Sequence, residues 1–199
     1  MKTPKSWSDI TIQQYYNLLE AIDLPLSDED KSVAILGALT DTDMEYIKEN
    51  VSIKDLTKAL HSLSFISNTK SEGAVKPTMR IGGKKISFDL ILRESSANSF
   101  ISLTELNKTP ELSKTNIHKV MAVFCYELKW WGKRKERTIK SQLELADFLL
   151  NNMTMNDAFR YRDFFLLSYQ NLQKSTLDYL ASKRMETLKT LKKVIAQTS

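Results

Sequence analysis

The sequence predicts a mainly α-helical protein with one β-hairpin, of the α+β class, in which a helical domain ends in a long C-terminal helix. Three observations predict this fold class. Apolar residues recur at helical spacing through most of the 199 residues. Gly82 and Gly83 separate two short runs of alternating apolar and polar residues, which is the pattern of a hairpin. Residues 155–195 contain neither Gly nor Pro, so no helix breaker stands in that stretch.

Residues 1–67 are predicted to form an acidic helical part with four short helices. The third of these helices is expected over residues 43–49, after a cluster of acidic residues. The other three begin at a hydroxyl side chain that can accept a hydrogen bond from the backbone amide three residues later. The three pairs with this spacing are Thr11 with Gln14, Ser27 with Asp30, and Ser52 with Asp55.

Residues 68–77 are polar and contain Gly73 and Pro77, which predicts a linker. The hairpin follows it, and the Gly82-Gly83 pair supplies the positive φ angles of a two-residue primed turn. A two-stranded ribbon is only marginally stable alone. We therefore expect the ribbon to pack on the helices or to pair with a strand of another chain.

The hairpin and the helices after it are predicted to occupy residues 78–154. One helix is expected between Ser96 and Leu106, the next over residues 113–126, then a loop over 127–137 and a helix over 141–150. Thr154 is expected to cap the long C-terminal helix of residues 155–199. The tail of that helix is amphipathic and either binds a partner or folds back on its own domain. We expect these parts to form one compact unit.

The net charge of +5 hides an uneven distribution along the chain. Residues 1–66 hold 6 Lys and 11 Asp or Glu, whereas the remaining residues hold 23 Lys or Arg and 13 Asp or Glu. Such a division favours either nucleic-acid binding or head-to-tail contact between copies, although an uneven solvated surface also explains it. No apolar run approaches the roughly 20 residues of a membrane helix, and a single cysteine fits a reducing compartment.

The sequence contains no constellation that indicates catalysis, a cofactor or a metal. His61 and His118 have no further ligands at metal-binding spacing. Cys125 follows an apolar stretch, so we interpret it as a buried structural thiol. The glycine pair lacks the Lys-Ser/Thr ending of a phosphate-binding loop. We therefore expect a protein that is not an enzyme.

One segment concentrates cationic and indole side chains and is the predicted contact site with a partner or with nucleic acid. Cations bind phosphates and an indole stacks on an unpaired base, but Trp and Arg are also frequent in protein interfaces. An exposed loop anchored to the core by its tryptophans is a third interpretation. The segment consists of Lys129, Trp130, Trp131, Lys133, Arg134, Lys135 and Arg137. A second predicted contact is the hairpin edge, with Arg80, Lys84 and Lys85.

The order of several short motifs resembles that of a group of small tailed-phage proteins. These motifs are the opening residues 7–15 (WSDITIQQY), the hairpin turn 81–84 (IGGK), residues 120–124 (VMAVF) and residues 163–165 (DFF). The similar proteins are tail-assembly-chaperone-like proteins or virion proteins of crAss-like, Bacteroidetes-infecting phages. The resemblance covers most of residues 7–170. It does not extend to the Lys-Trp-Trp-Gly-Lys-Arg segment or to the basic C-terminal helix.

This resemblance implies a non-enzymatic role in phage morphogenesis, at the tail or at the portal–tail junction, either as a tail assembly chaperone or as a structural component of the virion. The implied partners are other phage structural proteins and copies of the chain itself, without a membrane or a cofactor. The implied location is the host cytoplasm during assembly, or the virion. Nucleic-acid binding by the basic Trp-Trp loop is the alternative function.

Overall fold

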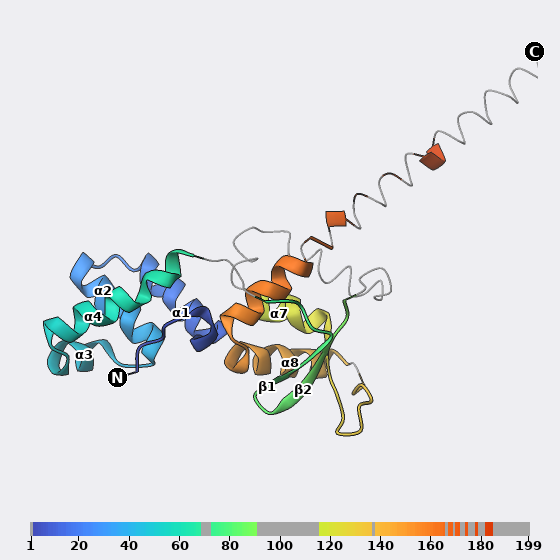
Figure 1. Cartoon of the computed structure of the whole chain (residues 1–199), viewed down its shortest axis with the longest axis horizontal. Helices are drawn as coiled ribbons and strands as arrows, with labels where there is room; N and C mark the ends of the chain where they lie inside the picture. The colour runs from blue at the N-terminus through green and yellow to red at the C-terminus, as the bar shows by residue number, and fades with distance from the viewer. Residues whose placement is uncertain are drawn as a thin grey trace, which may run out of the picture.

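The computed structural model describes residues 2–68, 73–90, 116–136 and 138–165, with single residues between 167 and 184. These residues are mainly helical and include one small antiparallel sheet of three strands. The mainly helical α+β class predicted from the sequence is therefore confirmed, whereas most of the predicted long C-terminal helix lies outside the described residues. Figure 1 shows the first four α-helices gathered at one side of the molecule and the sheet with its helices at the other.

The N-terminal part contains the four short α-helices that the capping patterns predict. The Thr11 hydroxyl accepts from the amide of Gln14, whose side chain accepts from the Thr11 amide, so the capping box is complete. Ser27 and Ser52 cap the second and fourth helices in the predicted way. The elements are η1 (Trp7–Asp9), α1 (Ile12–Asp23), α2 (Asp28–Thr40), α3 (Met44–Asn50), α4 (Ile53–Ser62) and η2 (Leu63–Ser67).

The sheet contains β1 (Thr78–Ile81), β2 (Lys84–Phe88) and β3 (Cys125–Glu127), in the order β1-β2-β3. Gly82 and Gly83 both have positive φ angles, 49° and 80°, which confirms the predicted primed turn. The third strand comes from the same chain, since Ser87 of β2 lies opposite Tyr126 of β3. The ribbon therefore needs no strand from another chain to become a sheet.

The prediction of one helix over residues 113–126 is wrong at its C-terminal end. The helix α7 (Ile117–Val123) stops before Cys125, which begins β3. Residues 120–125 are all apolar, so periodicity cannot mark the point where the helix ends and the strand begins. The edge of β2 determines where the helix ends, because pairing with β3 satisfies backbone groups of β2 that would otherwise stay unpaired. Cys125 is buried as predicted, in a strand instead of a helix.

The helix α8 (Ile139–Asn152) begins two residues earlier than predicted, after the N-cap Thr138. Residues 155–165 are also helical, and the Thr154 hydroxyl accepts from the amide of Asp157 at 3.3 Å as the cap. Most of the remaining C-terminal stretch, and the helix expected between Ser96 and Leu106, lie outside the described residues.

The N-terminal helices and the sheet side are held together near the start of α1. The amide of Ile12 donates to the carbonyl of Met153 at 3.1 Å, and that of Met155 donates to the carbonyl of Ile10 at 2.7 Å. The buried Trp7 ring and the Phe159 ring pack edge to face, with centroids 5.2 Å apart. The core is thus continuous between the two sides.

The end of the predicted linker is packed against the helix of residues 155–165. The Tyr161 hydroxyl donates to the carbonyl of Lys76 at 2.6 Å and accepts from its amide at 3.2 Å. Arg160 donates to the carbonyl of Ala74 at 3.3 Å. These bonds fix the direction in which the chain enters β1.

Candidate functional site

Residues 129–133, here called the tryptophan turn, form a tight reversal after β3. The amide of Gly132 donates to the carbonyl of Lys129, and the amide of Lys129 donates to the carbonyl of Lys133, both at 2.8 Å. Gly132 has a φ angle of +87°, which an L side chain rarely adopts. In Figure 1 the segment after β3 projects away from the sheet as a narrow loop.

The tryptophan turn presents both of its indole rings to solvent. Trp130 is 93% exposed and Trp131 is 51% exposed. The two rings pack edge to face with centroids 5.3 Å apart, and the Lys129 ammonium lies 5.2 Å from the Trp131 centroid. Trp130 therefore does not anchor the loop to the core, so that interpretation of the sequence is excluded for this residue.

Two cations of the predicted site, Arg134 and Lys135, form ion pairs at the base of the loop. The Arg134 guanidinium forms an ion pair with Asp89 at 2.8 Å and lies 4.4 Å from the Tyr126 ring centroid. Lys135 forms an ion pair with Glu127. Burial alone would raise the pKa of Glu127, but the nearby lysines outweigh burial and hold the pKa below its usual range.

The remaining predicted residues divide between the turn and the hairpin. Within the described part of the chain, Lys129 and Lys133 form no ion pair with a carboxylate. Arg137 lies outside the described residues. On the hairpin, Lys84 is paired with Glu127 at 3.4 Å, whereas Arg80 and Lys85 are exposed. Among the predicted basic residues that the structure describes, Lys84, Arg134 and Lys135 thus form ion pairs within the chain.

The first turns of α8 carry two exposed apolar residues that the sequence analysis did not single out. Ile139 is 80% exposed and Leu143, one helical turn later, is 58% exposed. The predicted helix starts at Ser141, so Ile139 lies outside the predicted helix. Helical spacing from the Thr138 cap would have placed both residues on one face.

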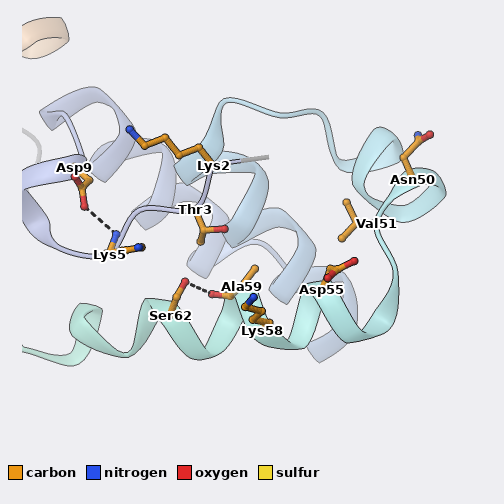
Figure 2. Close-up of a pocket in the computed structure, with 10 residues that line it drawn as sticks. All are labelled: Lys2, Thr3, Lys5, Asp9, Asn50, Val51, Asp55, Lys58, Ala59 and Ser62. Carbon is orange, nitrogen blue, oxygen red and sulfur yellow. Dashed lines mark hydrogen bonds between the residues drawn. The ribbon is translucent and has the colours of Figure 1, made fainter.

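A groove of about 700 Å³ lies between the N-terminal segment and α4 (Figure 2). It is flanked by Lys2, Lys5 and Lys58, and its walls include Val51 and Ala59. Figure 2 shows these residues coming from the N-terminal segment, α4 and the chain just before it. No pattern in the sequence predicts this groove, because the residues that line it are distant in the chain.

The groove also contains a carboxylate that already has local partners. Asp9 accepts from the backbone amide of Lys5 at 3.0 Å and from the Ser6 hydroxyl at 3.2 Å. The Lys5 amide is the main reason that the pKa of Asp9 lies below its usual range. The carboxylate thus orders the N-terminal segment.

A buried polar contact joins α1 to α7. The Tyr16 hydroxyl lies 3.1 Å from Nδ1 of His118 and accepts from the amide of Ile117 at 2.9 Å. His118 is 7% exposed, and burial is the main cause that lowers its pKa to about 4. The hydroxyl can donate to Nδ1 only when that nitrogen is unprotonated. This arrangement fits a neutral structural histidine.

The described residues show no group of three or more His, Cys, Asp or Glu side chains that could hold a metal ion. Among the same residues, no helix combines the length and the apolar character that crossing a bilayer requires.

No protein-family model, curated protein or solved structure matches the chain.

Proposed function

We propose that this chain is a non-enzymatic morphogenesis protein of a tailed phage, which acts by protein–protein contact through its tryptophan turn. The observation that carries the proposal is the 93% exposure of Trp130 at the tip of a hydrogen-bonded turn. A fully exposed indole gains more from burial against a partner than almost any other side chain. Tryptophan is accordingly enriched among the residues that dominate binding energy.

The base of the turn is suited to holding that indole in place. Arg134 is fixed between Asp89 and the Tyr126 ring, and Lys135 is paired with Glu127. A turn that is ordered before binding loses less conformational entropy when it binds. These ion pairs therefore support a role in positioning the turn.

The setting at the tail or the portal–tail junction rests on the motif resemblance alone. The resemblance implies either a tail assembly chaperone in the host cytoplasm or a structural component of the virion. Other phage structural proteins are then the partners.

Nucleic-acid binding is the second candidate, because Lys129 and Lys133 flank two exposed indoles on which bases could stack. It ranks second because Arg134 and Lys135 already neutralise carboxylates within the chain. Few phosphates could then be neutralised, which leaves a small electrostatic contribution to binding.

The test is quantitative mass spectrometry of purified particles and infected-cell lysate from the source phage, with the wild-type chain and with Trp130→Ala. We expect the wild-type chain in particles or bound to a virion protein in the lysate, and a loss of about tenfold in that recovery for Trp130→Ala. Ile53→Ala is the matched control, because Ile53 is 84% exposed on α4, away from the turn.

Two results would contradict the proposal. One is a wild-type chain that is found neither in particles nor with any virion protein. The other is binding of a labelled single-stranded oligonucleotide that depends on Trp130 and weakens steeply between low and moderate salt. That second result would assign the turn to nucleic acid.

A further inference from the structure

A second exposed apolar surface lies at the connection between α1 and α2. Residues 22–29, here called the acidic turn, are all exposed. They include Ile22, Leu24 and Leu26, which are among the large exposed apolar residues of the described chain. Such a cluster marks a candidate contact surface, since single exposed apolar residues are normal but adjacent ones are less so.

The apolar residues of the acidic turn are interleaved with carboxylates. Asp23, Asp28 and Glu29 are exposed and form no ion pair within the described residues. The next acid, Asp30, is already paired with Lys48 on α3. Asp28 and Glu29 also stand in the first turn of α2, where negative charge is favoured by the helix dipole.

This surface is complementary to the tryptophan turn in both apolar character and charge. One offers exposed leucines beside carboxylates, and the other offers exposed indoles beside the ammonium groups of Lys129 and Lys133. Contact would bury apolar area on both sides and bring opposite charges together at the rim. Complementary charge steers association and fixes orientation.

We propose that the tryptophan turn of one copy binds the acidic turn of a second copy, head to tail. This proposal rests on the proposed function in one respect, namely that the tryptophan turn is a protein-contact site, and it identifies the partner. The partner is a second copy because the chain itself carries the complementary surface.

The two surfaces belong to different sides of the molecule. The acidic turn joins two of the N-terminal helices, whereas the tryptophan turn follows β3 on the sheet side (Figure 1). A contact between two different surfaces is heterologous, and each bound copy leaves one surface free for the next. Such contacts produce rings when the rotation closes and filaments when it does not.

The groove beside α4 is a less suitable receptor for the tryptophan turn. Its lining contains three lysines, Lys2, Lys5 and Lys58, against two carboxylates, those of Asp9 and Asp55. The excess charge therefore has the same sign as Lys129 and Lys133. Like charges across a contact cost free energy. The acidic turn lacks this repulsion.

The test is sedimentation velocity of the full chain over a range of concentrations, with single and mixed variants. We expect the wild-type chain to self-associate, and Trp130→Ala to raise the dissociation constant about tenfold or more. Leu24→Ala combined with Leu26→Ala is expected to weaken association in the same direction. Ile53→Ala, at an exposed apolar residue outside both surfaces, is the control that leaves association unchanged.

A charge exchange makes the test specific for the pairing. Lys133→Glu and Glu29→Lys each place like charges across the contact and are expected to weaken self-association when alone. An equimolar mixture of the two variants can alternate, so that every contact joins opposite charges again. We expect the mixture to recover the wild-type size distribution.

A wild-type chain that stays monomeric, or a mixture that recovers nothing, overturns this pairing. If particle or virion-protein recovery still depends on Trp130, the proposed function survives that failure. If self-association follows the predicted pattern but the chain is absent from particles and from virion-protein complexes, the pairing stands and the proposed function falls. Trp130-dependent binding of a single-stranded oligonucleotide by a monomeric chain overturns both.

Discussion

Trp7 and Trp130 carry the same side chain in opposite surroundings. The Trp7 ring is buried, donates from Nε1 to the carbonyl of Asn68 at 2.7 Å, and meets the rings of Tyr15 and Phe65 edge to face. Trp130 is almost fully exposed. The first ring stabilises the fold, so only the second is available for a function outside the chain.

His118 provides a residue-scale prediction about pH. Its pKa is lowered to about 4 by burial, from 6.5 in the unfolded chain, and the nearby Lys119 acts in the same direction while Asp147 opposes it. Between these values the unfolded chain binds a proton that the folded chain does not. Stability therefore falls as pH drops from 6.5 to 4, by at most about 3 kcal/mol.

Urea unfolding at several pH values measures this dependence. His118→Gln removes the titrating group and is expected to flatten the slope over that window. Tyr16→Phe is the matched comparison, since it removes a hydroxyl and costs about 1 kcal/mol but keeps the histidine and its slope. An unchanged slope in His118→Gln would show that another group is responsible.

The Tyr16–His118 contact could not be predicted from the sequence. The two residues are separated by 102 positions, and no local pattern links them. The sequence spacing excludes His118 as a metal ligand and predicts no other role for it. Its role follows from the packing of both α1 and α7 on α8, which brings an imidazole and a hydroxyl together away from water.

At the scale of elements, the hairpin turn allows a comparison of two neighbouring glycines. A Cβ at Gly82 would lie 2.6 Å from Oδ1 of Asn152 and 2.9 Å from the Phe148 ring, whereas one at Gly83 would meet nothing within 4 Å. Both residues have positive φ, so both substitutions by Ala cost about 1–2 kcal/mol of backbone strain. Gly82→Ala adds a clash and is expected to cost about 1 kcal/mol more.

Thermal or urea unfolding of Gly82→Ala and Gly83→Ala measures this difference directly. Equal losses of stability would mean that the Asn152 side chain moves aside at no cost, and that the hairpin does not pack tightly on α8.

The helix starts and the hairpin turn could be predicted from the sequence, because residues close together in the chain determine them. The caps at Thr11, Ser27 and Ser52 and the Gly82-Gly83 turn are each specified within four residues, and the structure contains all of them. The strand β3 depends instead on an edge of β2 about 40 positions earlier. Its conversion from predicted helix to strand is a tertiary effect that propensity cannot reveal.

At the scale of the whole molecule, the sequence predicts which part of the chain is acidic and which is basic, but not which charged side chains pair with each other. Counting residues predicted an acidic N-terminal part and a basic remainder. The structure shows that several basic residues are neutralised by Asp89 and Glu127 within their own half. Among the described residues, Lys129 and Lys133 of the tryptophan turn form no ion pair with a carboxylate, and Asp23, Asp28 and Glu29 of the acidic turn form none with a cation.

The most direct test of the central claim, that the tryptophan turn contacts protein, is photo-crosslinking from position 130. A photoreactive phenylalanine analogue in place of Trp130 would keep an aromatic ring at the tip, both in the purified full chain and in infected cells. We predict protein adducts on irradiation, and those between copies should map to residues 22–29. Nuclease-sensitive adducts with nucleic acid, or no adduct at all, would contradict the account.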